Sequence, residues 1–407
     1  MTVQIRPASL LPGIPVANSP AAPTPNRLLR PGTLLLSNAR PGRTVSLPEH
    51  QAYWGPTPHA HLSQVIEAAE RTGLVGAGGA GFPTGRKLRS MVHGKSGPVI
   101  VNGSEGESAS GKDTVLLTHV PHLVLDGAVI TARALASREV IVRVPASRPT
   151  VIAILQAAIG QRHDGIRITV SPGEDSFIAG EATAVISSLQ GGPSKPVALG
   201  KPPTMRKGLR SRPVMLSNVE TYARLALAVR GHTGLSSLVT MSGAVLDSGV
   251  MELPTATPLG HVLQSTGADP ELAALITGGW HGTWIRPDDA RLSAPTNREA
   301  FRSAGWHWGA GALIAIPHDP CPVDVLHAIT DYLVGEGARQ CGPCVLGLES
   351  ARDDLAASRQ VTDRVTGRGL CAHPTATIAA IRSGQALLAE ELAAHRSGLC
   401  TNVGSRS

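Results

Sequence analysis

The feature that most restricts the fold of this chain is an alternation of short apolar runs and helical segments between residues 99 and 192. The apolar runs are VIVNG (99–103), EVIVRV (139–144) and IRITVSP (166–172). Helical periodicity is found in HLVLDGAVITARAL (122–135), PTVIAILQAAIG (149–160) and EATAVISSLQGG (181–192). Because strands and helices take turns, the sequence predicts a mainly parallel sheet covered by helices, that is, an α/β domain.

A glycine-rich loop, GLVGAGGAGFPTGRK (73–87), precedes the first of these strands. Gly76-x-Gly78-x-x-Gly81 has the spacing of a dinucleotide-binding fingerprint, but that fingerprint needs a strand before its first glycine. The preceding segment, VIEAAERTGL, is helical in pattern, so the expected order is helix, loop, short helix and strand. This order argues against an ordinary Rossmann site. Glycines that merely turn the chain remain an alternative.

Anion binding explains the loop better. Closely spaced glycines let backbone N–H groups converge on an anion and let a flat ring approach the backbone. Lys87 follows on the short helix, and the next loop, NGSEGESASGKD (102–113), adds amide, hydroxyl and carboxylate groups. Two such loops at neighbouring strand ends form a cleft in an open α/β sheet. We therefore expect a cradle for a flavin phosphate.

The whole chain divides by pattern into five segments. Residues 1–57 are rich in Pro, Ala and Arg without a sustained period, and are expected to form a disordered tail. Residues 58–232 hold the α/β domain, and 233–320 contain paired strands with a short helix, which predicts a β-grasp domain. Residues 321–398 are expected to form a helical bundle, followed by a short tail at 399–407.

Composition excludes several classes of function. The net charge of +7 comes from scattered basic residues without interleaved aromatics, so no nucleic-acid partner is expected. No apolar run reaches the roughly 18 residues of a membrane span, and the N-terminus lacks the pattern of a signal peptide. The odd count of five cysteines argues against a secreted disulfide framework and favours a reducing, cytoplasmic compartment. No nucleophile–base pair or H-E-x-x-H motif supports hydrolysis, and no protein side chain is predicted to be catalytic.

Four motifs carry a resemblance to a known family: GAGGAGFPTGRK, NGSEGESASGKD, FIAGEATA (177–184) and SNVET (217–221). In this order they resemble the FMN- and NADH-binding subunit of respiratory complex I and related subunits of NAD-linked hydrogenases and formate dehydrogenases. The resemblance covers roughly residues 58–395, including a β-grasp domain of the soluble-ligand-binding (SLBB) type and a helical domain with a CxxC motif. The glycine loop is also similar to that of the Rnf-type ferredoxin:NAD oxidoreductase, but the KD and SNVET residues favour the complex I branch.

The resemblance implies site residues at matching positions. Those expected to hold FMN are Gly76, Gly78, Lys87, Asn102, Ser104, Glu105, Gly180, Glu181, Ser217, Asn218 and Thr221. Those expected near NAD(H) are Phe82, Glu107 and Lys201. The chain departs from the family at several points: two further aromatics are replaced by Ser90 and Thr204, the loop arginine by Ala77 and the second Glu of the GEET motif by Ala182. These departures put NADH use in more doubt than flavin binding.

The family also carries an iron–sulfur cluster on a C-x-x-C-x-P-C pattern and a distant fourth cysteine. Here Cys341, Cys344 and Cys371 match three ligands, but the first position is Ala338. Several outcomes stay open. Cys321 or Cys400 substitutes for the missing ligand, a 4Fe–4S or 3Fe–4S cluster forms on three cysteines, zinc binds with His373 as a fourth ligand, or no metal binds.

The function that the resemblance implies is electron input: NADH is oxidised through FMN, and single electrons leave through the cluster to a ferredoxin-like or quinone-linked partner. The chain would then act in the cytoplasm, or peripherally at the inner face of the cell membrane as part of a membrane-bound redox complex. The alternative is a scaffold or binding subunit that keeps the fold without oxidising NADH.

Overall fold

A computed structural model describes residues 27–30, 32–91, 96–197 and 208–400. These residues form two compact units. Unit 1 comprises residues 237–400 together with 27–29 and the short segment 107–110. Unit 2 comprises the described residues between 30 and 106 and between 111 and 236.

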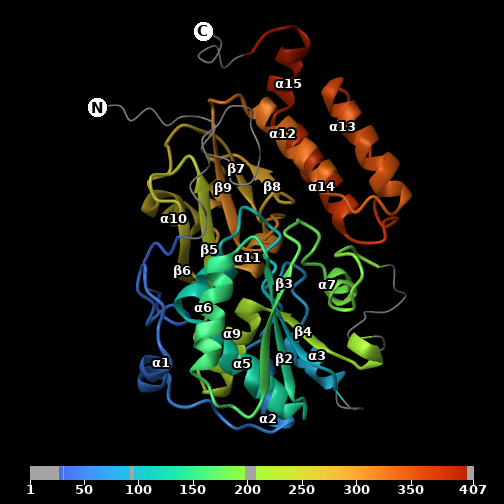
Figure 1. Cartoon of the computed structure of the whole chain (residues 1–407). Helices are drawn as coiled ribbons and strands as arrows, with labels where there is room; N and C mark the ends of the chain where they lie inside the picture. Colours follow the sequence, from blue (N-terminus) through green and yellow to red (C-terminus); the bar gives the residue numbers. More distant parts are fainter. Residues whose placement is uncertain (1–26, 31, 92–95, 198–207, 401–407) are drawn as a thin grey trace. The chain divides into compact units, whose positions relative to one another are not determined.

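Unit 2 is built on a four-stranded sheet with the order β3-β2-β1-β4, in which every neighbouring pair is parallel (Figure 1). Its strands are β1 (Val99–Asn102), β2 (Glu139–Pro145), β3 (Arg167–Gly173) and β4 (Met215–Asn218). Its helices are α1 (Leu47–Trp54), α2 (Leu62–Arg71), α3 (Thr84–Arg89), α4 (Lys112–His119), α5 (Pro121–Ala134), α6 (Pro149–Gly160), α7 (Ala182–Leu189), the 3₁₀ turn η2 (Leu209–Ser211) and α9 (Val219–Val229). The expected parallel sheet covered by helices is confirmed.

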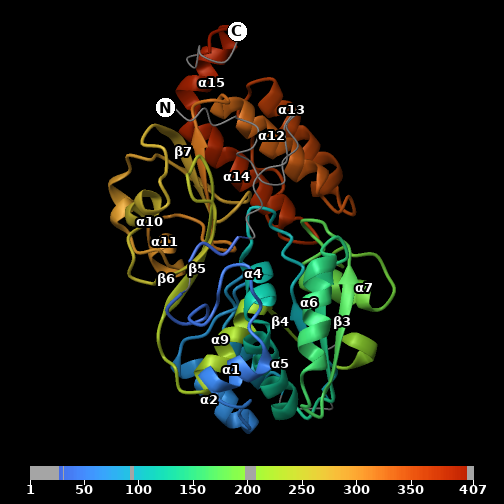
Figure 2. The same cartoon turned by 60° about the vertical axis from the view of Figure 1, so that its left-hand side comes forward.

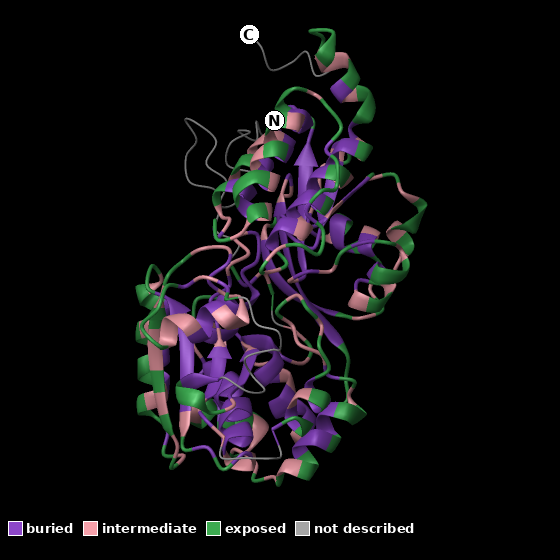
Figure 3. Cartoon of the chain, turned by 90° about the vertical axis from the view of Figure 1, so that its right-hand side faces the viewer, coloured by how far each residue is buried: buried purple, intermediate pink, exposed green. Residues whose placement is uncertain are grey.

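The centre of unit 2 lies where α5 and α9 pack against the sheet. Apolar side chains of β1 and of most of β2 are buried, as continuous apolar runs predict for central parallel strands, whereas edge strand β3 is largely exposed or half-buried (Figure 3). A Cβ atom on Gly127 of α5 would lie 1.9 Å from the carbonyl oxygen of Tyr222 on α9. The two helices therefore touch backbone to backbone. In Figure 2, α6 runs along the edge strand β3 and buries Val151 and Leu155.

The prediction of a disordered tail over residues 1–57 is wrong for the described part of that range. Helix α1 begins with a proline in its first turn and a capping box, in which Glu49 accepts a hydrogen bond from the Ser46 backbone. Leu35 and Leu36 are fully buried, although their surroundings have no helical or strand period. His50 of α1 lies 2.8 Å from the buried carboxylate of Asp126 on α5, which anchors this segment to the core of unit 2.

Unit 1 combines a five-stranded mixed sheet with a group of C-terminal helices. The sheet order is β6-β5-β9-β7-β8, formed by β5 (Ser236–Gly243), β6 (Gly249–Pro254), β7 (Leu272–Thr277), β8 (Thr283–Ile285) and β9 (Ala312–Pro317). The helices are α10 (Leu259–Ser265), the 3₁₀ turn η3 (Ala290–Ser293), α11 (Arg298–Ser303), α12 (Pro322–Gly335), the π-helical turn η4 (Pro343–Gly347), α13 (Leu348–Ala356), α14 (His373–Leu387) and α15 (Ala389–Arg396).

The sheet of unit 1 has β-grasp topology, as expected. Counted within this sheet, its strand order is 2-1-5-3-4, and the first and last strands, β5 and β9, run parallel at its centre. Strand β7 pairs antiparallel with both β9 and β8. The side chains of Leu259, Phe301 and Leu313 are buried in one apolar cluster on this sheet.

The C-terminal helices pack onto the same sheet. The backbone N–H of Trp284 on β8 donates to Ser383 of α14 over 2.9 Å, and a Cβ on Gly384 would lie 2.6 Å from Leu326 of α12. Residues 237–400 consequently form one compact unit, whereas the sequence suggested a boundary near 321. In the described part of the chain, no single helix is both long and apolar enough to cross a membrane; α4 and α5 reach that composition only as a pair bent by 94°.

Candidate functional site

The glycine loop of unit 2 runs from α2 to α3, so a helix and not a strand precedes it. This order rules out the Rossmann arrangement, as the sequence indicated. The loop closes on itself, because the N–H of Gly76 donates to the carbonyl of Phe82 and the N–H of Thr84 to that of Leu74. Gly79 and Gly81 have φ angles of 103° and 64°, which side chains disfavour. Glycine is therefore needed here to form a compact backbone loop.

This loop lies against the first turn of α9. The N–H of Ala77 donates to the Thr221 hydroxyl over 3.0 Å, and a Cβ on Gly78 would be 3.5 Å from Cβ of Asn218. Asn218 caps the helix, since its side-chain oxygen accepts from the N–H of Glu220. The structure thus brings together a glycine loop and the N-terminus of an 11-residue helix, whose partial positive charge favours an anion.

The second predicted loop begins at the end of the neighbouring strand. Asn102 and Asn218 are register partners at the carboxyl ends of β1 and β4, with Ser217 one position earlier on β4. The Asn102 side-chain amide donates to the carbonyl of Gly180 over 2.9 Å. A Cβ on Gly180 would approach Cβ of Ser104 at 3.3 Å. Residues from three separated motifs therefore meet at one edge of the parallel sheet, which is where open α/β sheets bind ligands.

Two carboxylates expected to contact FMN have structural roles in this unit. Glu105 accepts hydrogen bonds from the N–H groups of Asp113 and Thr114 at the start of α4, and pairs with Arg148 at 2.9 Å. Glu181 caps α7 by accepting from the N–H groups of Thr183 and Ala184. Both carboxylates hold the site's helices in place, and direct contact of either with FMN stays a prediction.

Two lysines occupy different electrostatic environments in unit 2. The Lys87 ammonium donates to the carbonyl of Leu216 on β4, and burial lowers the Lys87 pKa to about 8. Lys112 was not among the predicted site residues. Its ammonium lies 2.6 Å from Asp113, 3.2 Å from Glu220 and 2.9 Å from the side-chain oxygen of Asn218.

The surroundings of Lys112 explain its charge state. Burial disfavours the ammonium, but the adjacent carboxylates of Asp113 and Glu220 outweigh this effect, so the Lys112 pKa is raised. Burial raises the Asp113 pKa to about 6 even beside this cation. The sequence signal for the cluster was the KD pair of the second loop together with the glutamate of SNVET.

The residues predicted to bind NAD(H) fall into separate parts of the structure. Phe82 projects from the glycine loop with 44% of its surface exposed, and the Arg86 guanidinium lies 5.8 Å from its ring centre. Ser90, at an expected aromatic position, ends α3. Lys201 and Thr204 lie outside the described residues.

Glu107 belongs to the short segment that groups with unit 1. Its carboxylate accepts from the N–H groups of Ala109 at 3.0 Å and Trp280 at 2.9 Å. The Trp280 indole N–H donates to the Ser108 hydroxyl, so Trp280 makes two hydrogen bonds to segment 107–110. Burial of the Glu107 carboxylate outweighs these hydrogen bonds and raises its pKa to about 7.

The cysteine motif in unit 1 offers an incomplete ligand set. Cys344 is buried beside Cys341. Its pKa is raised, mainly by burial and to a smaller extent by the neighbouring Cys341 thiol. The first position of the family pattern is Ala338, which is 4% exposed. Across the described ranges, which include all five cysteines, no trio of close metal-binding atoms contains Cys341, Cys344 or Cys371.

Substitution by Cys321 or Cys400 is wrong. Cys321 caps the start of the 14-residue helix α12, whereas Ala338 follows the other end, about 20 Å along the axis. Cys400 lies with Cys321 in a different cluster. A cluster held by four cysteines does not fit this chain, and zinc with His373 as fourth ligand gains no support from the geometry.

Comparison with known proteins agrees with the arrangement of unit 2. Residues 69–227 match the Nuo51 FMN-binding domain family. The chain is 27% identical over 316 residues to an NADH-quinone oxidoreductase subunit of Rhizobium meliloti, covering 70% of this chain and 74% of that protein. It is 27% identical over 339 residues to NADP-reducing hydrogenase subunit HndC of Solidesulfovibrio fructosivorans, covering 75% and 67%.

A solved structure supports the same relationship. The NAD+-reducing nickel–iron hydrogenase in its air-oxidised state contains a chain that superposes with a TM-score of 0.73 at 25% identity. The match covers 83% of this chain and 63% of that one, so this chain spans less than two thirds of its structural relative.

Proposed function

We propose that this chain, which resembles the FMN-binding subunits of NADH-quinone oxidoreductases, is an electron-input subunit that binds FMN in unit 2 and oxidises NADH. The observation that carries the proposal is the contact between the glycine loop and the capped N-terminus of α9. Both features favour an anion, and FMN brings a phosphate.

The residues of unit 2 suit FMN in their chemistry. Gly76 and Gly78 keep side chains off the loop where it meets the first turn of α9, and Lys87 with that turn supplies positive charge for the phosphate. Asn102, Ser104 and Gly180 form a polar wall at the end of β1. Bound FMN would supply hydride acceptance and single-electron release, and the residues of this chain would position the flavin and nicotinamide rings.

Binding of NADH rests on fewer residues. The exposed ring of Phe82 offers a stacking surface for adenine. Ser90 provides no second surface, which costs on the order of 1 kcal/mol in affinity relative to an aromatic residue. We propose that NADH is the reductant and binds more weakly than where several aromatic residues are present, with Glu107 and Lys201 as further contacts.

We propose a ferredoxin-like or quinone-linked subunit as the electron acceptor, because the relatives named above are subunits of redox enzymes. Cys341, Cys344 and Cys371 supply three of the four thiols of the family pattern. These three cysteines are an incomplete ligand set, and the proposal includes no electron-transfer step through them. The replacement of the first thiol of that pattern by Ala338 favours the second candidate, a subunit that retains the fold and FMN but does not oxidise NADH.

An anaerobic visible spectrum of the purified full chain, recorded before and after addition of NADH, distinguishes these candidates. Flavin absorbance that bleaches with NADH is the expected result. Flavin that stays oxidised with NADH but is reduced by dithionite supports the second candidate. A protein that takes up no FMN after reconstitution contradicts both.

A further inference from the structure

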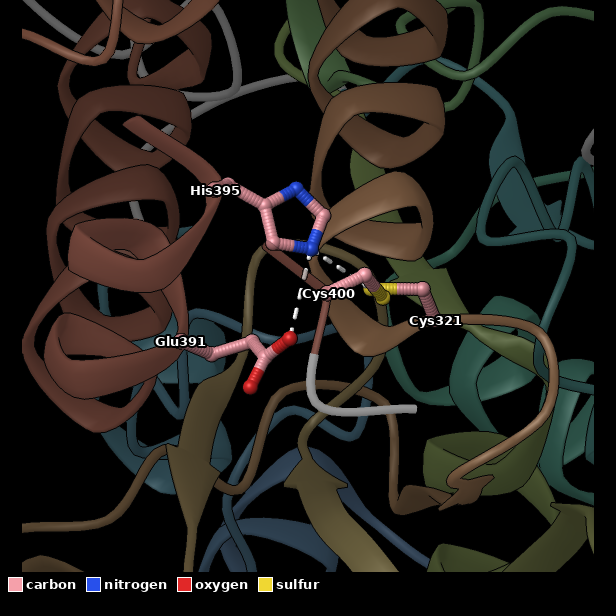
Figure 4. A group of neighbouring side chains, drawn as sticks. All are labelled: Cys321, Glu391, His395 and Cys400. Carbon is pink, nitrogen blue, oxygen red and sulfur yellow. Dashed lines mark hydrogen bonds and ion pairs between the residues drawn. The ribbon is translucent and has the colours of Figure 1, made fainter. Parts of the chain in front are cut away.

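Four side chains with metal-binding atoms converge at the C-terminal end of unit 1. Cys321 lies immediately before α12, Glu391 and His395 lie on α15, and Cys400 follows that helix (Figure 4). One ligand atom from each lies within 4.8 Å of all the others. The cluster is separate from the Cys341 motif, which lies beyond the opposite end of α12.

The sequence places these groups together by simple geometry. Glu391 and His395 are four residues apart on α15, so they project from the same face of the helix. The turn after α15 then returns the chain, so that the Cys400 thiol lies within 4.8 Å of the Cys321 thiol. Three of the four groups thus come from one ten-residue stretch.

Two distances within the cluster are close to the edges of a tetrahedral zinc site. The Nε2 atom of His395 is 3.4 Å from Sγ of Cys321 and 3.2 Å from Oε1 of Glu391. In a tetrahedron with ordinary zinc–ligand bond lengths, the corresponding edges are about 3.6 Å and 3.4 Å. In Figure 4 the Nε2 atom of His395 faces both the carboxylate and the sulfur atom, as a metal ion at the centre of the cluster would require.

The surroundings support a closed site. Cys321 is 3% exposed, and the other three residues are half-buried.

We propose that Cys321, Glu391, His395 and Cys400 bind a zinc ion that fastens the C-terminal helix α15 to the start of α12. Two thiolates and an imidazole select zinc over magnesium or calcium, which prefer oxygen ligands. Because the protein supplies all four ligands, no position is left for a substrate, and the role is structural.

The test measures zinc in the full chain purified anaerobically under reducing conditions. Elemental analysis by mass spectrometry should find a single equivalent of zinc per chain. Cys321→Ser and Cys400→Ser should each lose it. Glu391→Gln, which leaves both thiols and the histidine in place, should weaken zinc binding by about tenfold or more, measured by competition with a chromophoric chelator.

The matched control is a variant with Cys341, Cys344 and Cys371 all replaced by serine. It should retain zinc and, after exchange with Co²⁺, show the visible bands of tetrahedral thiolate-ligated cobalt. Circular dichroism checks that each variant folds. If a cysteine variant fails to fold, the zinc affinity of Glu391→Gln still tests the proposal.

Three outcomes would overturn the proposal. The first is loss of zinc from the variant that lacks the three cysteines of the Cys341 motif, together with retention of zinc in Cys321→Ser. The second is a reduced wild-type chain that binds neither zinc nor cobalt. The third is a disulfide between Cys321 and Cys400, found by mass spectrometry under non-reducing conditions in protein that had been offered zinc before oxidation.

Discussion

Replacement of Lys112 by methionine tests whether the buried charge cluster holds the candidate site together. The side chain of Lys112 is 2% exposed, and its ammonium contacts the carboxylates of Asp113 and Glu220. Methionine keeps similar volume but removes the charge. Glu220 keeps its pair with Arg224 at 2.8 Å, whereas Asp113 retains only neutral partners among those described above. Removing one partner of a buried ion pair costs about 3–5 kcal/mol.

Lys87→Met is the matched control, because Lys87 is also buried but faces a carbonyl instead of a carboxylate. The fall of the Lys87 pKa from its ordinary 10.5 to about 8 means that its charged form costs about 3 kcal/mol in the folded state. Methionine removes that cost and also the hydrogen bond to Leu216, which is worth about 1–3 kcal/mol. These effects oppose each other, so the free energy of unfolding should change by about 1–2 kcal/mol at most.

The assay is urea unfolding of both variants without FMN, followed by circular dichroism at pH 7 and pH 5. Lys112→Met should lose about 3–5 kcal/mol at pH 7. This loss in free energy of unfolding should be smaller at pH 5. Without the Lys112 cation the Asp113 pKa rises further, so the folded variant protonates Asp113 at pH 5 and no longer buries an unpaired charge there. A Lys112→Met protein that unfolds within about 1 kcal/mol of wild type at pH 7 would refute the assigned role of the cluster.

Three further predictions concern the flavin, the core and the anchored N-terminal segment. Affinity for FMN should fall as the pH rises from 7 to 9, because Lys87 loses its proton near pH 8 without FMN, whereas a bound phosphate keeps the ammonium protonated. Calorimetry should find no such pH dependence of affinity in Lys87→Met. An equal pH dependence in that variant would contradict the role of Lys87. Gly127→Ala should destabilise the chain by about 3 kcal/mol or more, because its Cβ would lie 1.9 Å from a backbone oxygen of Tyr222. Gly160→Ala, with open space around it, should instead stabilise α6 by about 0.5–1 kcal/mol, and equal unfolding midpoints for the two variants would disprove the packing argument. Asp126→Asn should cost about 3–5 kcal/mol at pH 7, because the Asp126 pKa is held well below its usual range by His50 and two arginines; the difference from wild type should narrow as the pH falls below 4, and a constant difference would show that the charge is not responsible.

The fold of unit 2 was largely predictable from the sequence because its central strands β1 and β2 are mainly apolar runs. Such runs identify central parallel strands, and the helix before Gly76 was enough to exclude a Rossmann loop. The strand order was not predictable, because the crossover from β3 to β4 depends on which helix faces pack together. The burial of Leu35 and Leu36 was not predictable, because a short leucine run flanked by turn residues has neither a helical nor a strand period.

The candidate site was predictable only as a set of motifs. Asn102, Asn218 and Gly180 are far apart in the chain, and resemblance to a family placed them together before the strand register did so. The helix-capping role of Glu105 could not be predicted, because it depends on how the second loop folds back onto α4. The partners of Cys321 were not predictable, because they lie about 70 residues later in the chain. The spacing Glu391-x-x-x-His395 places two side chains on one face only once α15 has formed.

The segment 107–110 has a consequence for how this chain could have been assembled in evolution. The chain passes between the two units at 29/30, 106/107, 110/111 and 236/237. A gene fragment that encodes residues 30–236 therefore carries Glu107 and Ser108 away from Trp280, their hydrogen-bond partner. Recombination at a single linker cannot exchange unit 2 intact for another flavin domain. An exchange that keeps these two hydrogen bonds must also transplant the turn around Trp280.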